Sequence, residues 1–121
     1  MTAAGVAGHY RSGENELRIA ASGRDEIRID FSGVYLTVSG AANIGDAAGE
    51  ARLDGDRAVL VPDGTEGCAI TLRFRADGSI RVTQAGADFE CGFGSNVHAD
   101  GIYRRTTGRP AGEGTSGGAT R

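Results

Sequence analysis

The residues best suited to catalysis lie close together near the carboxyl end of the chain: Ser95, His98 and Asp100. A serine, a histidine and an aspartate can form a nucleophilic triad, in which the base reaches a serine held on a strained turn. Closeness in sequence does not supply that geometry. We therefore interpret this stretch as a polar loop and expect no catalytic residue and no enzyme activity.

Three other patterns have the residue types of a reactive site without its spacing. His9 and His98 are not accompanied by a third ligand at the spacing of a zinc site. The Gly-Phe-Gly string at 92–94 is not followed by the helix start that a phosphate loop needs, so it predicts a bulged turn. Asp88 and Glu90 are acids that we expect to be solvated. The sequence thus predicts no metal site and no cofactor.

The elements that position these residues are expected to be short strands. The chain has 121 residues, 21 of them glycine, and no tryptophan, which suits one domain with many tight turns. Apolar and polar residues alternate, and the runs often end at Gly near Asp or Ser, which is typical of antiparallel hairpins. The expected strands span residues 8–11, 15–21, 25–38, 47–53, 57–62, 68–75, 79–86 and 100–106.

The pattern predicts an all-β fold, namely a small antiparallel β-barrel of about eight strands with one disulfide. The barrel domain is expected to cover residues 1–107. Residues 108–121 lack apolar periodicity and consist of Gly, Ser, Thr, Pro, Ala, Arg and a single Glu, so we expect a disordered tail there.

The hairpin between residues 68 and 86 allows its register to be worked out. A two-residue turn would place a charged side chain opposite Phe74. A three-residue loop at 76–78 instead pairs Phe74 with Ile80 and Leu72 with Val82, and it puts a glycine at the left-handed position of the turn. Hydrophobic pattern and turn chemistry therefore predict the same register.

The same register sets Cys68 opposite Gly86. A glycine there leaves room for a sulfur atom, and a tight reversal near residues 87–88 would bring Cys91 back toward Cys68. Two cysteines also fit a pair of buried thiols in a cytosolic protein. The strand geometry favours a Cys68–Cys91 bridge.

The run at 25–38 changes its alternation at Gly33, beyond which Val34, Leu36 and Val38 occupy the opposite parity. A β-bulge at Ser32-Gly33 would flip the alternation and bend the strand. The alternative is that one face of this strand is an exposed apolar patch used for binding.

The first and last expected strands share the string Gly-x-Tyr-Arg, at residues 8–11 and 101–104. Two matching ends would pair and close a barrel, which removes exposed sheet edges.

Charge and hydropathy limit the classes of partner. The formal net charge of −3 disfavours a nucleic-acid binder, which needs a basic stripe, and suits a cationic protein partner. No apolar run reaches the length of a membrane span. With a disulfide, these features predict a periplasmic or secreted protein, and they leave its oligomeric state open.

From Cys68 onward the chain reads Cys-x-Ile-x-Leu-x-Phe, then Val-x-Gln-x-Gly at 82–86, then Cys-Gly-Phe-Gly-x-Asn-Val-x-Ala-x-Gly-x-Tyr from Cys91 to Tyr103. This stretch resembles small bacterial envelope domains of unknown function. In size, strand count and single disulfide the chain is similar to the periplasmic β-barrel inhibitors of c-type lysozyme (MliC/PliC type). Those inhibitors block the lysozyme cleft with a Ser-Gly-x-x-Tyr loop and a lysine-bearing strand. Here the nearest string, at 32–35, is one residue shorter, and the chain has no lysine.

The resemblance implies a non-enzymatic extracytoplasmic binding module with a protein partner, for which a c-type lysozyme is the candidate. Its contacts would come from loops at one end of the barrel, and the predicted partner-binding residues are Ser32, Tyr35, Asn43, Asn96 and His98. One alternative is a lipocalin-like carrier with an open barrel that holds a small apolar ligand. Another is a purely structural envelope domain with a filled core.

Overall fold

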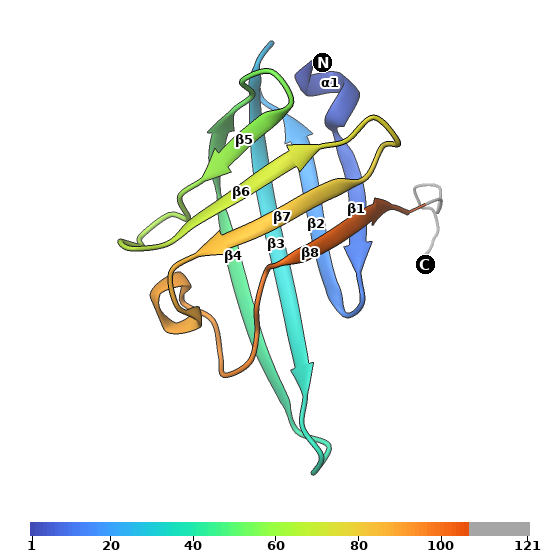
Figure 1. The fold of residues 1–121 in the computed structure, drawn as a ribbon. Helices are drawn as coiled ribbons and strands as arrows, with labels where there is room; N and C mark the ends of the chain where they lie inside the picture. The colour runs from blue at the N-terminus through green and yellow to red at the C-terminus, as the bar shows by residue number, and fades with distance from the viewer. Residues whose placement is uncertain (107–121) are drawn as a thin grey trace.

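A computed structural model describes residues 1–106, so residue 107 and the predicted tail at 108–121 lie outside the described residues (Figure 1). The elements are α1 (Ala3–Val6), β1 (Gly8–Ser12), β2 (Asn15–Ala21), β3 (Glu26–Leu36), β4 (Ala42–Arg52), β5 (Arg57–Leu60), β6 (Ala69–Phe74), β7 (Ile80–Ala85), the 3-10 helix η1 (Asp88–Cys91) and β8 (Gly101–Arg105). The all-β prediction is confirmed. Neither short helix was expected, and β4 begins earlier than predicted. Within the described residues no helix has the length and apolarity to cross a bilayer.

The eight strands form one antiparallel sheet in the order β4-β3-β2-β1-β8-β7-β6-β5, which curls into a nearly closed barrel. In Figure 1, β5–β8 cross in front of β2–β4. The first and last strands pair as expected, through Tyr10 with Arg105 and Arg11 with Arg104. That pairing lies in the middle of the sheet rather than at its seam. The seam lies between β4 and β5, where the Asp63 N–H donates to the Ala48 carbonyl at 2.8 Å.

The curled sheet has two layers, β1–β4 and β5–β8, and aliphatic side chains fill the space between them. Register partners on β2 and β3, such as Leu17 with Phe31 and Ile19 with Ile29, face inward and are buried. The β6–β7 register is confirmed, since Phe74 pairs with Ile80 and Leu72 with Val82. The residues with the most deeply buried side chains are Tyr10, Leu17, Ile27, Ile29, Leu60, Ile70, Leu72, Ile80, Cys91, Val97 and Tyr103.

The repeated Gly-x-Tyr-Arg string has a structural reason beyond strand pairing. The hydroxyl of Tyr10 donates to the Val6 carbonyl at 2.8 Å, and that of Tyr103 donates to the Ala99 carbonyl at 2.8 Å. In both cases the acceptor lies four residues upstream. Because β1 and β8 are antiparallel, the two tyrosines fasten the segments that cover opposite ends of the barrel.

The bulge predicted at Ser32-Gly33 is wrong. Strands β3 and β4 stay in one register from Glu26 opposite Arg52 to Leu36 opposite Ala42, so the alternation never flips. Gly33 lies opposite Gly45 on the inner face. Apolar residues beyond Gly33 therefore continue on the outer face, and the alternative of an exposed apolar patch is the one that the structure supports.

The Cys68–Cys91 disulfide is confirmed, with the two Cα atoms 5.1 Å apart. The structure explains the glycine at position 86 differently from the sequence prediction. A Cβ atom at Gly86 would lie 2.2 Å from the carbonyl oxygen of Gly67, so the glycine admits a close backbone contact rather than a sulfur atom.

Replacing Gly86 by alanine should therefore destabilise the fold more than the same change at Gly78. Both glycines have positive φ, +105° and +88°, but a Cβ at Gly78 meets no atom within 4 Å. We expect Gly78→Ala to lower the free energy of unfolding by about 1–2 kcal/mol and Gly86→Ala by about 3 kcal/mol or more. Urea denaturation of both variants measures this, and equal losses would contradict the backbone contact.

Candidate functional site

The lower end of the barrel in Figure 1 is closed by residues 86–100, which we call the plug segment. The Phe93 ring lies 5.1 Å from the Phe31 ring, centroid to centroid. A Cβ atom at Gly45 would lie 2.7 Å from the Phe93 ring, and one at Gly33 would lie 2.8 Å from a Val97 methyl. The paired glycines of β3 and β4 thus make the space that the two apolar side chains of the plug segment fill.

Polar contacts at several points fasten the plug segment to the barrel. The disulfide ties Cys91, at the end of η1, to Cys68, which directly precedes β6. The Asn15 side-chain amide donates to the His98 carbonyl at 2.7 Å and to the Tyr103 hydroxyl at 3.1 Å. Burial raises the pKa of Tyr103 to about 12, so this hydroxyl keeps its proton and continues to donate to Ala99. The plug segment is therefore attached to the barrel by one covalent bond and by hydrogen bonds.

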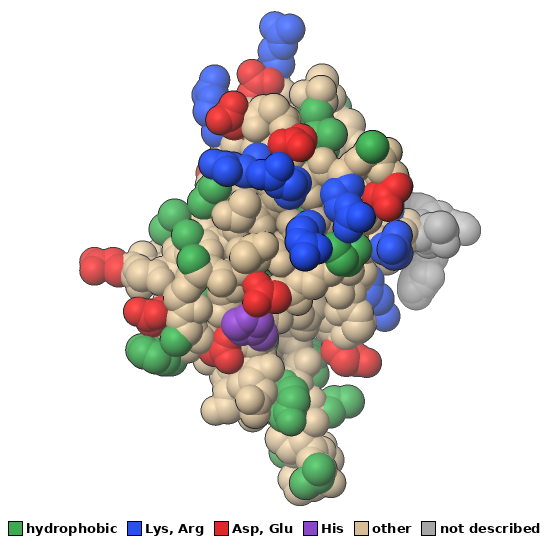
Figure 2. All heavy atoms as spheres, in the orientation of Figure 1, with side chains coloured by type: hydrophobic (Ala, Val, Ile, Leu, Met, Phe, Trp, Pro, Cys, Tyr) green, Lys and Arg blue, Asp and Glu red, His purple; other side chains and the backbone are tan. Residues whose placement is uncertain are grey.

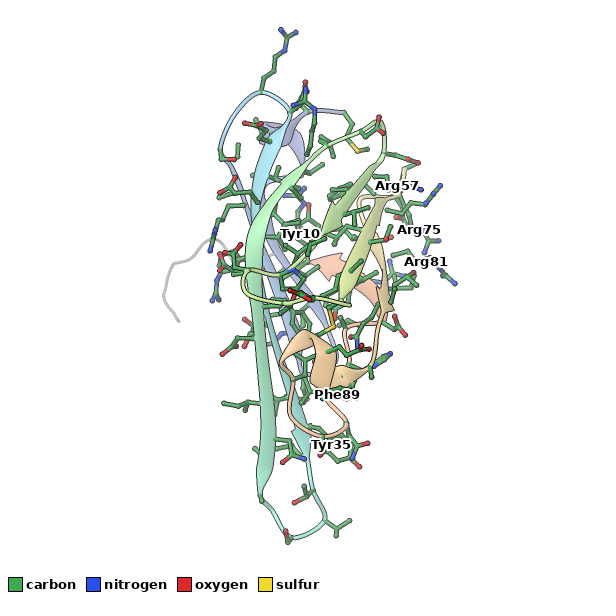
Figure 3. All side chains as sticks on the ribbon, turned by 90° about the vertical axis from the view of Figure 1, so that its left-hand side faces the viewer. Tyr10, Tyr35, Arg57, Arg75, Arg81 and Phe89 are labelled. Carbon is green, nitrogen blue, oxygen red and sulfur yellow. A yellow bond between two sulfur atoms is a disulfide. The ribbon has the colours of Figure 1, made fainter. Side chains whose placement is uncertain are left out.

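Beyond this base, residues 33–45 of β3 and β4 extend past the rest of the barrel, and we call them the protruding hairpin (Figures 1 and 3). Four of the eight large apolar side chains exposed in the described residues belong to it. The exposed fractions are 59% for Leu36, 64% for Ile44 and 111% for Val38. This concentration of exposed apolar side chains makes the protruding hairpin the candidate binding surface of the described residues.

Three of the predicted partner-binding residues come together at the hairpin. Tyr35 lies directly opposite Asn43 in the register, on the inner face of the hairpin. The Asn43 side chain donates to the Ser95 carbonyl at 3.0 Å, next to Asn96. Asn96 adopts a positive φ of 66° in a turn closed by a bond from the Val97 N–H to the Gly94 carbonyl, a position that favours Asn or Gly. Figure 3 shows Tyr35 and Phe89 on the side of the hairpin that carries the plug segment.

The other two predicted residues lie elsewhere. Ser32 is opposite Asp46 on the outer face of β3, whereas Tyr35 is on the inner face. His98 lies in the part of the plug segment next to β7 and β8. The five residues therefore do not form one surface. The bulge predicted at Ser32-Gly33 would have brought Ser32 and Tyr35 to one face, and without it the alternation separates them.

His98 is held between two carboxylates. Its Nδ1 lies 2.6 Å from Asp88 Oδ1, and its Nε2 lies 2.7 Å from Asp100 Oδ2. Gln84 completes the cluster, because its amide donates to Asp88 at 3.1 Å and its carbonyl accepts from the Ala99 N–H at 2.8 Å. The bond to Asp88, with a further contribution from Asp100, raises the pKa of His98, and the same bond lowers the pKa of Asp88. The charges of the cluster join Asp88, His98 and Asp100 within the plug segment, and the hydrogen bonds of Gln84 tie that segment to β7.

This geometry bears on the chemistry weighed from the sequence. Both ring nitrogens of His98 contact carboxylates, so neither is directed at the Ser95 hydroxyl as a triad requires. Among residues 1–106, no group of three or more His, Cys, Asp or Glu side chains is arranged to hold a metal ion. What the lower end offers is contact surface and hydrogen-bonding groups.

The sequence reasoning missed Leu36, Ile44 and Phe89 as site residues. Phe89 is 79% exposed on η1. The available signal was the change of parity at Gly33, because apolar residues on the polar parity of a strand lie on its outer face unless a bulge intervenes.

The histidine cluster should make stability depend on pH. The raised pKa of His98 contributes stability in full below its ordinary value of about 6.5, and that contribution is lost as pH rises through the raised value. The lowered pKa of Asp88 acts in the opposite sense, with a contribution lost as pH falls below about 4. Wild type should therefore exceed His98→Gln in unfolding free energy by at most about 1 kcal/mol near pH 5.5, since the pairs are half exposed, and the excess should shrink by pH 9.

Urea denaturation across this pH range measures the difference. His9→Gln is the matched control, because His9 contacts no carboxylate within the described residues. A pH-independent difference between wild type and His98→Gln would contradict the ion-paired arrangement.

Comparison of the chain with known proteins found no matching family model, no matching curated protein and no matching solved structure.

Proposed function

We propose that the protein is a non-enzymatic, extracytoplasmic binding module that docks a protein partner on its protruding hairpin. The observation that carries this proposal is the concentration of exposed apolar side chains on a hairpin that extends beyond the barrel. The plug segment, held by the disulfide, packs against the base of this hairpin. A projecting apolar element of this kind fits a concave surface. The hydrogen bond from Asn43 to the Ser95 carbonyl restrains its base, which reduces the conformational entropy lost on binding.

The hairpin has two distinct faces. Val34 lies opposite Ile44 on the outer face, and Leu36 follows on the same side. The inner face carries Tyr35 and Asn43 beside the turn of the plug segment. An aromatic side chain with a free hydroxyl next to amide groups can supply the directional contacts that an aliphatic face lacks.

Charge supports a cationic partner. Residues 33–45 contain no charged side chain, and the adjacent plug segment contains Asp88, Glu90 and Asp100 but no arginine. A basic protein would be steered toward this end, which raises the rate of association more than the affinity.

The sharpest form of the proposal is an inhibitor of a cationic, wall-degrading hydrolase such as a c-type lysozyme. The sequence resemblance to the lysozyme inhibitors points to the same partner. The disulfide is compatible with the oxidising compartment in which such hydrolases act.

The alternative of a lipocalin-like carrier has less support. Aliphatic side chains pack the interior of the barrel, and three pockets lined by described residues, of about 250 to 350 Å³, are open to the surface. A small apolar ligand would need an enclosed space.

The test is a binding titration of the oxidised protein with c-type lysozyme, combined with a turbidity assay of wall lysis. We expect micromolar or tighter binding, and we expect the Leu36→Ser/Ile44→Ser double variant to weaken it by about tenfold or more, since each side chain loses apolar contact. Val59→Ser/Val61→Ser is the matched control, because these β5-side valines are exposed to 41% and 55% and lie away from the hairpin.

Two results would count against the proposal. If wild type does not bind at micromolar concentration, the lysozyme partner is discarded. If the hairpin and control variants bind a partner equally well, the hairpin is not the docking element.

A further inference from the structure

We propose that the outer face of β5–β8 binds a linear acidic polysaccharide through a row of arginines. The row consists of Arg57, Arg73 and Arg81, which we call the arginine ladder. Arg57 lies directly opposite Arg73, and Arg73 lies directly opposite Arg81, so the three side chains cross three neighbouring strands in line. Figure 3 shows Arg57 and Arg81 pointing away from the barrel, with Arg75 between them.

The arginine ladder departs from the charge pattern of the other layer. Between the strands of β1–β4 the charged register partners are of opposite sign: Arg11 with Glu16, Arg18 with Asp30, Arg28 with Glu50, and Glu26 with Arg52. Where β1 meets β8, Arg11 also lies opposite Arg104. Like charges placed directly opposite on neighbouring strands destabilise a sheet. Opposite charges are paired between the strands of β1–β4, whereas the arginine ladder pairs like charges twice in succession across β5–β7. A regular departure of this kind from a local rule indicates a functional constraint.

Few acidic side chains of the described residues lie close enough to neutralise the arginine ladder. Arg73 approaches Asp56 only to 4.0 Å, and Arg57 and Arg81 form no ion pair with the residues that the structure describes. Figure 2 shows arginine side chains gathered over the upper part of this face. Because the whole chain carries a net charge of −3, a polyanion would be drawn to this face and not to the protein in general.

The geometry of the ladder fits a linear polymer. Neighbouring strands lie about 4.8 Å apart, so the ladder presents one guanidinium per strand over about 10 Å. Guanidinium groups bind carboxylate and phosphate oxygens through paired hydrogen bonds. The chain has no lysine, so the argument rests on the positions of the arginines rather than on the choice of arginine over lysine.

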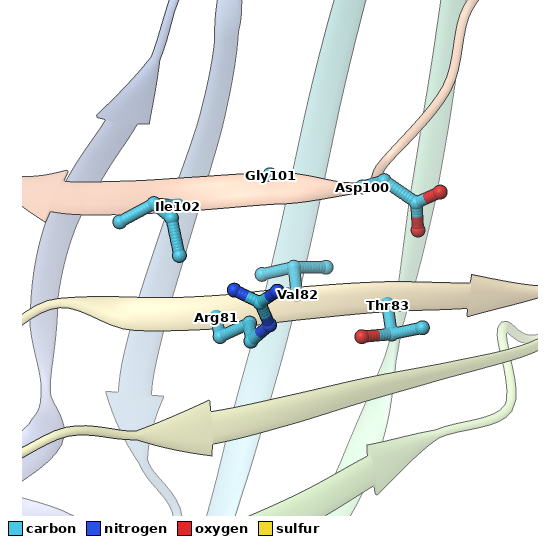
Figure 4. A pocket seen from close by; sticks show the side chains of 6 residues that line it. All are labelled: Arg81, Val82, Thr83, Asp100, Gly101 and Ile102. Atoms are coloured by element: carbon cyan, nitrogen blue, oxygen red, sulfur yellow. The ribbon is translucent and has the colours of Figure 1, made fainter.

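Neighbouring groups favour a polymer of sugars. A pocket of about 300 Å³ lies between Arg81 and Thr83 of β7 on one side and Asp100, Gly101 and Ile102, where β8 begins, on the other (Figure 4). The Thr83 hydroxyl next to the Arg81 guanidinium suits a sugar unit, which carries hydroxyl groups as well as its acid. The Asp100 carboxylate is already bound by His98 and by the Gln84 N–H.

Other polyanions fit this face less well. The aromatic residues of these strands, Phe74 and Tyr103, are buried, so the outer face has no ring on which bases could stack. It also lacks the tryptophan or tyrosine side chains that anchor a protein at a lipid interface.

The proposal is tested with polygalacturonate as the acidic polymer and dextran as the neutral one, at low salt. We expect wild type to bind polygalacturonate and not dextran. Arg73→Ala/Arg81→Ala should weaken binding by about tenfold or more, because hydrogen bonds between charged groups are lost. Arg18→Ala/Arg28→Ala is the matched control, since it changes the net charge equally on the opposite layer, and it should change affinity by less than about threefold.

Thermal melting checks that the ladder variant folds, and we expect it to be at least as stable as wild type because a like-charge contact is removed.

Equal losses in the two double variants, or no binding by wild type at low salt, would overturn the proposal. Equal or tighter binding of single-stranded DNA or phosphatidylglycerol vesicles would overturn the assignment to a polysaccharide. The hairpin variants leave this face intact, so failure of the lysozyme proposal would not affect the result.

Discussion

The packing of Phe93 and Val97 against the paired glycines Gly33 and Gly45 is the contact on which the lower half of the molecule depends. Without side chains at these two positions, β3 and β4 admit the plug segment against their inner face. The disulfide and the Tyr103 hydroxyl then hold that segment in place. The same contact supports the protruding hairpin at its base, which allows an element with few core contacts of its own to remain extended.

This arrangement separates the molecule into regions with different surfaces. The lower end is apolar on the hairpin and acidic on the plug segment. The outer face of β5–β8 is rich in arginine, and the outer face of β1–β4 carries ion pairs of opposite sign. Two binding proposals therefore arise from one small barrel, and each rests on a surface that contributes little to the core.

The features predictable from the sequence were those fixed by local pattern. Alternation located the strands, and the turn at 76–78 fixed the β6–β7 register, which in turn placed Arg73 opposite Arg81 and Cys68 near Cys91. The change of alternation at Gly33 was interpreted as a bulge. That interpretation requires every apolar residue of the strand to be buried, and this is not the case here. Here the inner positions are occupied by Phe93 and Val97 from a distant part of the chain, and no local pattern reveals such packing. The contacts of His98 with Asp88 and Asp100 could not be predicted for the same reason, since Asp88 approaches His98 only through the fold of the plug segment.

Hydrogen–deuterium exchange of the Phe93→Ala variant tests most directly whether the plug segment supports the hairpin. Removal of a buried phenylalanine costs about 3–5 kcal/mol where the site cannot collapse, and here the loss should be concentrated at the lower end. The account predicts that amides in residues 33–45 exchange at least about tenfold faster relative to those near Tyr10, in conditions where the barrel remains folded. Unchanged exchange in the hairpin, or an equal acceleration at both ends of the barrel, would contradict it.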